Sequence, residues 1–314
     1  MFLRGVSESP MRQIWLNGEL LPESEARVSV YDDALMFGSM VFEMLRTFNL
    51  RPFKLREHLE RLRASAEMTG LSLPYTLDEL EYAHDQLLEA NRPTVGPTDE
   101  LRTLINVSRG TLPIYHRIVP KGAWAMMMAF PLRWVLEGTS SWYDTGVDGF
   151  IPVQRTIPAQ LMDPKIKHRS RLYLKLAALE AKKPSDWPIL LDPDGFLAES
   201  TGANVFLVKK GRVYTPEPRN CLRGISRQYV MDLLARQSRP AVEKNLEPYD
   251  LHEAEEAFFA CTPYSILPCV SLNGRLIGEG KPGPVTKGLM QHWSQNVGCD
   301  FVKQAKGWDH AGRT

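Results

Sequence analysis

Two segments of the sequence carry residues whose types and spacing suit one small ligand. In the first segment, residues 199–206, the carboxylate of Glu199 enters an apolar, strand-like run. A carboxylate in such a run needs a partner, because burying an isolated charge is costly. About twenty residues later, Gly224-Ile225-Ser226 opens a helical stretch whose first backbone amides would bind an anion. Pyridoxal 5'-phosphate (PLP) would use both segments, because it has a basic ring nitrogen and a phosphate.

Both segments also have a simpler interpretation. Glu199 could be an exposed carboxylate at the end of a strand, and Ser226 is expected to be the N-cap of the following helix in any case. The binding role is favoured by Gly202 and Asn204, which supply turn chemistry where a ligand would approach the backbone. Thr262, at the end of a later strand, is a further candidate donor to the phosphate.

Arg61 is a candidate phosphate ligand on a predicted helix. His58 and Arg61 share a face of that helix, since they are three residues apart. The arginine could form a surface ion pair with Glu57 or Glu60, or it could bind a phosphate as a bidentate fork.

Lys167 lies in the basic run from Lys165 to Arg171. Such a run is most often a solvated surface or a patch that binds phosphate or nucleic acid. Alternation along an extended chain would place Lys165 and Lys167 on the same side. A lysine that forms a Schiff base must lose its charge before it attacks, and burial beside Arg169 or Arg171 would favour the uncharged form.

Composition limits the class of protein. The 314 residues allow two domains, and a net charge of +1 with 24% charged residues gives no strong field for nucleic acid or an anionic membrane. The four cysteines have neither a disulfide framework nor a zinc spacing, which favours free thiols in a reducing compartment. No apolar segment resembles a signal peptide or a membrane span. We therefore expect a cytoplasmic protein with small-molecule ligands, no nucleic acid or membrane partner and no metal site.

Hydrophobic periodicity predicts an α/β protein of the α+β type with two domains. In the first domain, residues 13–133, strands are expected at 14–16, 41–47, 101–107 and 123–130, and helices at 53–68 and 77–90. The turn signal Asn17-Gly18 predicts an opening hairpin. Residues 134–148 lose this periodicity and collect small residues, which predicts an interdomain linker.

The second domain is predicted at residues 149–296. Helices are expected at 171–183, 227–236 and 285–293, strands at 189–191 and 204–208, and hairpin turns at Lys210-Gly211 and Asn273-Gly274. Hairpins interleaved with helices argue against a doubly wound parallel sheet. Residues 1–12 and 297–314 are expected to be tails.

The sequence motifs resemble those of the class IV (fold type IV) PLP-dependent aminotransferases. That group includes branched-chain aminotransferases, D-amino acid aminotransferases and 4-amino-4-deoxychorismate lyase. The matching motifs are residues 34–43, 58–61, 199–206, 224–227 and 283–287, together with Lys167 and Thr262. The resemblance implies a small N-terminal α/β domain, a larger β-rich C-terminal domain with helices, and PLP in the cleft between them. It also implies a homodimer in which a loop of the partner completes each active site.

Residue by residue, the resemblance implies that Lys167 is the Schiff-base lysine and that Glu199 is the partner of the pyridine nitrogen. The family's phosphate-binding residues match Arg61, Ile225, Ser226 and Thr262. The separation between Lys167 and Glu199 fits the family, which favours Lys167 over Lys165. Lys167 would move the substrate α-proton, and Glu199 would keep the ring cationic so that it accepts electrons.

The substrate-binding segments match two branches of the family. Residues 34–43, which include Phe42, and residues 278–287 resemble the branched-chain enzymes, whereas residues 107–116 resemble the D-amino acid enzymes. Glu100 stands where the branched-chain enzymes have a carboxylate-binding tyrosine. Ile114 replaces an arginine of the D-amino acid enzymes, and Pro263 removes a backbone donor. The candidate substrate residues are Phe42, Arg102, His116 and Arg171.

We therefore expect PLP-dependent transamination between a branched-chain L-amino acid and a 2-oxo acid. A D-amino acid or amine transaminase is the alternative, and Glu43 disfavours 4-amino-4-deoxychorismate lyase because lyases have a threonine there. A family member that keeps PLP without transamination is another hypothesis. A non-enzymatic module that binds phosphate or nucleic acid through Lys165 to Arg171 is the hypothesis of a different class, and the near-neutral net charge counts against it.

Overall fold

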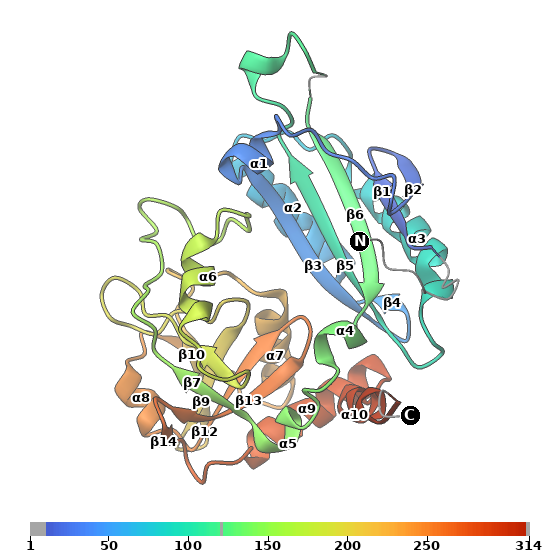
Figure 1. The fold of residues 1–314 in the computed structure, drawn as a ribbon. Helices are drawn as coiled ribbons and strands as arrows, with labels where there is room; N and C mark the ends of the chain where they lie inside the picture. The colour runs from blue at the N-terminus through green and yellow to red at the C-terminus, as the bar shows by residue number, and fades with distance from the viewer. Residues whose placement is uncertain (1–10, 120–121, 312–314) are drawn as a thin grey trace. The chain divides into compact units, whose positions relative to one another are not determined.

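The computed structural model describes residues 11–119 and 122–311, which form two compact units (Figure 1). The first unit extends to Trp134 and also contains Ile166–Ser170. The second unit contains Val135–Lys165 and the chain from Arg171 onward. The segment that carries Lys167 therefore belongs to the first unit, although the sequence suggested the second domain.

The first unit is built on an antiparallel six-stranded sheet with the strand order β2-β1-β6-β5-β3-β4. The strands are β1 (Gln13–Leu16), β2 (Glu19–Pro22), β3 (Met40–Phe48), β4 (Arg51–Pro52), β5 (Leu101–Ser108) and β6 (Trp124–Pro131). The predicted Asn17-Gly18 turn joins β1 to β2, and both of its residues have positive φ values, 50° and 97°.

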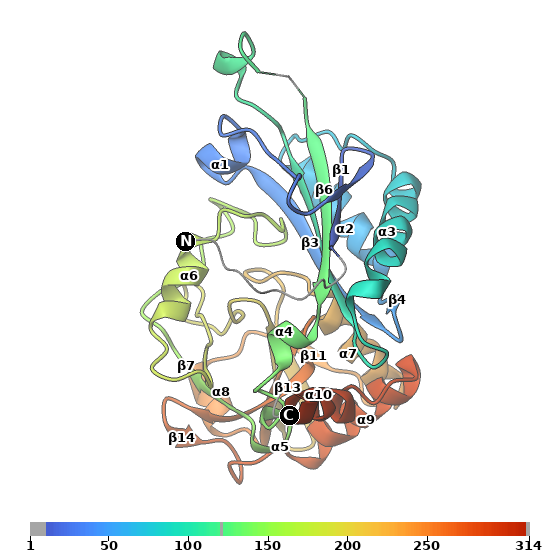
Figure 2. The same cartoon turned by 45° about the vertical axis from the view of Figure 1, so that its right-hand side comes forward.

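Two amphipathic helices, α2 (Leu55–Met68) and α3 (Leu77–Asn91), cover one face of this sheet (Figure 2). Leu59 and Leu62 of α2 pack in the same core as Leu45 and Ile105 of the sheet. Thr76 starts α3 with a capping box. The remaining short helices of this unit are α1 (Asp33–Phe37), η1 (Arg92–Thr94) and η2 (Pro113–Tyr115).

Residues 166–170 add an extended segment along the first half of β3. The Lys167 carbonyl accepts a hydrogen bond from the Phe42 amide at 3.0 Å, and the Arg169 amide donates to the Met40 carbonyl at 2.9 Å. Val41 and His168 form the antiparallel bridge between these two contacts. This pairing joins residues about 125 positions apart, so no local pattern in the sequence could indicate it.

The second unit contains an eight-stranded mixed sheet with the order β11-β10-β9-β12-β13-β7-β8, and β14 pairs with β13. The strands are β7 (Val147–Phe150), β8 (Asp186–Pro188), β9 (Asn204–Lys209), β10 (Arg212–Pro216), β11 (Val242–Lys244), β12 (Glu256–Cys261), β13 (Ser265–Leu272) and β14 (Arg275–Leu276). The pairings β7–β8, β7–β13 and β10–β11 are parallel. The predicted hairpins at Lys210-Gly211 and Asn273-Gly274 are confirmed.

Helices α7 (Ile225–Arg236) and α9 (Pro284–Val297) pack against each other and against β12. The ring centroids of Tyr229 and Trp293 are 4.7 Å apart at their contact. The other helices are α4 (Arg133–Leu136) at the boundary of the units, α5 (Trp142–Thr145), α6 (Leu172–Leu179), α8 (Pro248–His252) and α10 (Phe301–Ala311). None of the helices described in residues 11–119 and 122–311 has the length and apolarity needed to cross a membrane.

Three predictions of local structure are wrong. The expected linker at 134–148 contains α5 and the start of β7, and Tyr143 in it is buried and donates to the Tyr264 carbonyl. Residues 301–311 of the expected C-terminal tail form α10, whose Phe301 and Trp308 are buried. The strand expected at 189–191 lies earlier, as β8. The helix α5 was missed because four residues are too few to show periodicity. Tertiary burial, which the sequence pattern does not report, explains α10 and the position of β8.

Candidate functional site

Lys167 lies against the ring of Phe42 in the first unit. Its Nζ atom is 4.8 Å from the ring centroid, and its backbone amide donates to the Ser65 hydroxyl at 3.0 Å. Lys165 belongs to the second unit, where its Nζ atom is 2.7 Å from the Asp163 carboxylate. The structure thus separates the two candidate lysines, one on an aromatic ring and the other in an ion pair.

Arg61 binds the carboxylate of Glu43 on β3. Its Nε and Nη2 atoms donate to the two oxygens at 2.7 and 2.8 Å, and His58 Nδ1 is 2.7 Å from Oε2. Glu43 is fully buried. Burial raises the pKa of Glu43, but the charges and hydrogen bonds of Arg61 and His58 outweigh it and hold this pKa well below its usual range. Burial lowers the pKa of His58, against the opposing effect of Glu43.

The predicted substrate residue Arg102 lies opposite Arg46 in the register of β3 and β5. The guanidinium of Arg102 is 5.5 Å from the Phe130 ring centroid, and that of Arg46 is 4.0 Å from the Phe48 ring centroid. Sequence reasoning missed Arg46. Strand alternation from Phe42 would have placed it on the same face of the sheet as Phe42.

His116 and Arg171 are two further predicted substrate residues, and each has contacts of its own. His116 Nε2 is 2.9 Å from the Thr111 carbonyl within its own loop. Arg171 belongs to the second unit and interacts electrostatically with Tyr173 and Glu199. Burial and the charge of Glu199 raise the pKa of Tyr173 to about 12. Sequence reasoning did not identify Tyr173, since only its proximity to these charges distinguishes it.

Glu100, the first departure from the family motif, has a structural role. Its buried carboxylate accepts hydrogen bonds from the Thr47 hydroxyl at 2.6 Å and from the backbone amides of Asn49 and Leu50 at 2.7 and 3.0 Å. Asn49 and Leu50 have φ values of 53° and 57°. Glu100 therefore stabilises the left-handed turn between β3 and β4. Ile114 is 75% exposed, and Pro263 lies in the turn between β12 and β13.

Glu199 in the second unit is tied to the loop that precedes α7. Its Oε2 atom accepts from the Leu222 amide at 3.1 Å, and the Asn204 side chain donates to the Leu222 carbonyl at 2.9 Å. A Cβ atom on Gly224 would lie 2.1 Å from Asn204 Oδ1, so a larger residue would require the Asn204 side chain to move. The buried carboxylate of Glu199 is thereby fixed to the loop at Leu222, which leads into the start of α7.

The N-terminus of α7 has no side-chain cap among the described residues. Its N-cap is Gly224, so the prediction that Ser226 is the N-cap is wrong, and Ser226 is instead the second residue of the helix. Beside Glu199, the buried Ser200 hydroxyl has no hydrogen-bond partner within the described chain. Thr262 follows the end of β12, whose Ala260 pairs with Asn204. These donors, with Glu199, fit a ligand that has a phosphate and a basic nitrogen.

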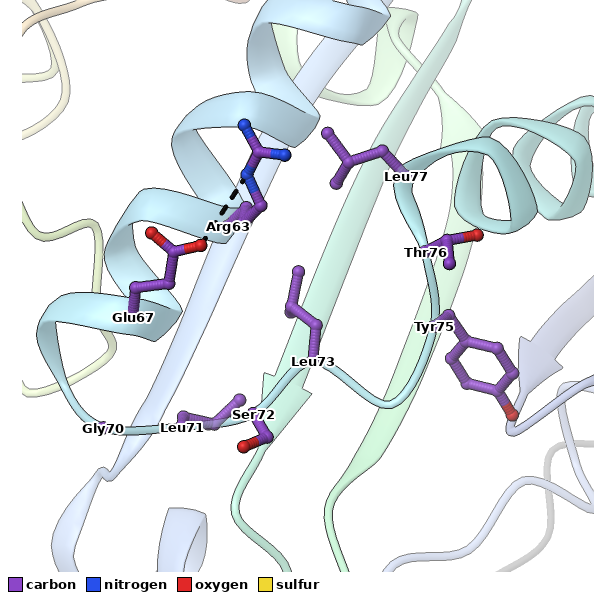
Figure 3. Close-up of a pocket in the computed structure, with 9 residues that line it drawn as sticks. All are labelled: Arg63, Glu67, Gly70, Leu71, Ser72, Leu73, Tyr75, Thr76 and Leu77. Atoms are coloured by element: carbon purple, nitrogen blue, oxygen red, sulfur yellow. Dashed lines mark ion pairs between the residues drawn. The ribbon is translucent and has the colours of Figure 1, made fainter.

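A groove of about 590 Å³ lies elsewhere in the first unit, between α2 and the start of α3. Leu73 and Leu77 point into it, and Arg63 and Glu67 form an ion pair on its α2 side (Figure 3). None of the predicted site residues lines this groove. We assign it no role in the chemistry.

A family model described as amino-transferase class IV matches residues 40–272 of the chain. The chain therefore belongs to the class IV aminotransferase family, whose members are PLP-dependent enzymes that transfer amino groups. This membership confirms the predicted family, the α/β fold of fold type IV and PLP as the cofactor.

Individual relatives agree with the family match. The chain is 33% identical over 302 residues to the branched-chain-amino-acid aminotransferase-like protein 2 of Arabidopsis thaliana, covering 92% of this chain and 51% of that protein, so it spans about half the length of that relative. It is 31% identical to the putative branched-chain-amino-acid aminotransferase of Methanocaldococcus jannaschii, covering 89% of this chain and 94% of that protein. It is 28% identical to the D-alanine aminotransferase of Bacillus licheniformis, covering 93% of this chain and 99% of that protein.

Solved structures are similar over almost the whole chain. The branched-chain amino acid aminotransferase of Escherichia coli superposes with a TM-score of 0.82 at 28% identity, covering 91% of this chain and 94% of that chain. The branched-chain aminotransferase of the archaeon Thermoproteus uzoniensis, solved with norvaline, gives a TM-score of 0.80 at 28% identity, covering 95% of this chain and 97% of that chain. Another branched-chain amino acid aminotransferase, solved with pyridoxamine 5'-phosphate, gives a TM-score of 0.83 at 26% identity, with the same coverage of 95% and 97%.

Proposed function

We propose that the protein transfers the amino group of a branched-chain L-amino acid to a 2-oxo acid. The observation that carries the choice of substrate is the face of β3 and β5 on which Phe42 and Met44 are followed by the cross-strand pair Arg46 and Arg102. Apolar side chains suit a branched aliphatic group, and guanidinium groups suit carboxylates. The relatives named as branched-chain aminotransferases support the same substrate.

Within this proposal, the residues of the sequence motifs would serve one cofactor. Bound PLP supplies an electron sink for the substrate α-carbon. The amides at the start of α7, the Ser226 hydroxyl and Thr262 would hold its phosphate, with the guanidinium of Arg61, oriented by Glu43, as a further donor. Glu199 holds a proton at the ring nitrogen. Lys167 takes the proton from the substrate α-carbon and returns it at the cofactor, as a general base and acid.

We also propose a homodimer, because the first unit exposes a group of apolar side chains. Leu35 and Phe37 of α1 are 66% and 69% exposed, and Ile114 is 75% exposed. The loops that carry them adjoin, since the rings of Tyr31 and Tyr115 are 4.6 Å apart. A second copy of the chain would cover such a surface. Replacement of Phe37 by aspartate should then shift the mass in solution, measured by light scattering, from dimer to monomer.

A cytoplasmic location is part of the same proposal. None of the four cysteines, all of which lie in the described part of the chain, forms a disulfide, and three of them are buried, which suits a reducing compartment. Localisation of a tagged full-length chain would test this assignment directly.

D-amino acids are the alternative substrates, favoured by residues 107–116 and by the D-alanine aminotransferase relative. The test mixes the PLP-loaded protein with single L-amino acids, D-amino acids or amines and follows the cofactor absorbance. Conversion by leucine, isoleucine and valine supports the proposal. Faster conversion by D-alanine would support the alternative, and conversion by none of them would leave a PLP-binding protein without transamination.

A further inference from the structure

Arg169 lies beside Lys167 on the same aromatic ring. The guanidinium carbon of Arg169 is 3.9 Å from the Phe42 ring centroid, and Lys167 Nζ is 4.8 Å from that centroid. The two cationic groups are therefore at most about 9 Å apart, since both distances refer to one point. The backbone bonds from Arg169 to Met40 and from Phe42 to Lys167 fix both residues along β3.

Asn106 fixes the direction of the Arg169 guanidinium. Its Oδ1 atom accepts from Nη2 at 2.6 Å and from Nε at 3.2 Å. Asn106 is buried and lies opposite Phe42 in the register of β3 and β5. An amide oxygen orients a guanidinium without cancelling its positive charge, so this contact holds a cation near the amine of Lys167.

We propose that Arg169 is a positioning residue that keeps the amine of Lys167 in its uncharged, reactive form. A second positive charge at this distance disfavours the ammonium form of the lysine. The inference rests on the proposed role of Lys167 in proton transfer. It deepens that role by naming the group that keeps the amine uncharged and able to accept a proton.

The His58 imidazole on α2 interacts electrostatically with Lys167, and it also faces the carboxylate of Glu43 on β3 and the guanidinium of Arg61. Glu43 and Arg61 form a bidentate ion pair, so their opposite charges largely offset each other at the lysine. Arg169 is the cation that shares the Phe42 ring with Lys167.

The experiment measures the reactivity of Lys167 as a function of pH in the full chain after removal of the cofactor. Reductive methylation with formaldehyde and cyanoborohydride proceeds through the uncharged amine, and peptide mass spectrometry quantifies the product at Lys167. In Arg169→Met, whose side chain still covers the ring, the pH midpoint should rise by about 0.5 to 1.5 units, from Coulomb's law at about 9 Å and an effective dielectric of roughly 20 to 50. Arg169→Lys keeps the charge and should stay close to the wild type.

Arg63→Gln is the matched control, because it removes one positive charge from α2 at the surface groove. An unchanged midpoint in Arg169→Met, or an equal rise in Arg63→Gln, would overturn the proposal. If circular dichroism shows that Arg169→Met does not fold, Asn106→Asp replaces it. That variant places a counter-charge on the guanidinium and must raise the midpoint. Borohydride fixation of pyridoxal on the loaded protein tests the proposed function separately, since the methylation result does not depend on it.

Discussion

Replacement of Glu43 by glutamine should destabilise the first unit by about 3 to 5 kcal/mol, the cost of breaking a buried ion pair. Glu43 is fully buried and receives three short contacts, two from Arg61 and one from His58. Glutamine keeps the shape but removes the charge, and it turns an amide group towards one of these donors. The Arg61 side chain, only 14% exposed, would then be left without its carboxylate.

Equilibrium unfolding in urea, followed by tryptophan fluorescence and circular dichroism, would measure this loss. The control is Glu67→Gln, the same chemical change at the surface, because that carboxylate is 69% exposed and 3.8 Å from Arg63. The control should lose less than about 1 kcal/mol. The double variant with Arg61→Gln should lose less than the sum of the single variants, by about 1 to 3 kcal/mol. A loss below about 1 kcal/mol in Glu43→Gln, or strict additivity, would refute the reasoning.

The same substitution should change the response to acid. The folded pKa of Glu43 lies below its ordinary value of 4.5, so its contribution to stability is present above about pH 4.5 and is lost as the pH falls further. The folded pKa of His58 lies below 6.5, so its contribution is also lost as the pH falls below 6.5. Glu43→Gln should therefore lose the component of acid sensitivity that sets in below about pH 4.5.

Three further predictions concern other parts of the chain. Gly283→Ala should destabilise the second unit by more than about 2 kcal/mol in urea, since its Cβ atom would lie 2.1 Å from the carboxyl carbon of Glu256, whose carboxylate caps α9. The control is Gly288→Ala in α9, whose Cβ atom would have no neighbouring atom within 4 Å and which should stabilise the unit by up to about 1 kcal/mol. Burial, with a smaller effect of a second histidine, lowers the pKa of His84 to about 3. The free energy of unfolding should therefore decrease below pH 6.5 by up to about 1.4 kcal/mol per pH unit. His84→Gln should make this dependence on pH weaker, and an unchanged dependence in the variant would refute the prediction. After borohydride reduction, mass spectrometry should find a pyridoxyl group on the wild type and on Lys165→Ala but not on Lys167→Ala, and the reverse result would reassign the lysine.

Local elements of both units could be predicted from the sequence. The apolar spacing of residues 53–68 predicted α2, and the Asn17-Gly18 turn predicted the first hairpin, because helix and hairpin signals depend on residues a few positions apart. The sequence also predicted that Glu199 and the segment at Gly224 serve one ligand, since both belong to short motifs with their own turn chemistry. The structure adds a direct hydrogen bond between Glu199 and the loop that precedes Gly224.

Tertiary structure alone decided which distant residues meet. It placed Lys167 beside Phe42 through a strand-like contact, joined Arg61 to Glu43 and used Glu100 to hold a turn. Residues 301–311, expected to be part of a tail, form a helix because one face of it is buried in the fold. Such contacts join positions far apart in the chain, and their energy comes from burial and ion pairing after the sheets form. A sequence pattern that repeats every two to four residues carries no information about that pairing, so the chemistry of single residues was visible in the sequence while their partners were not.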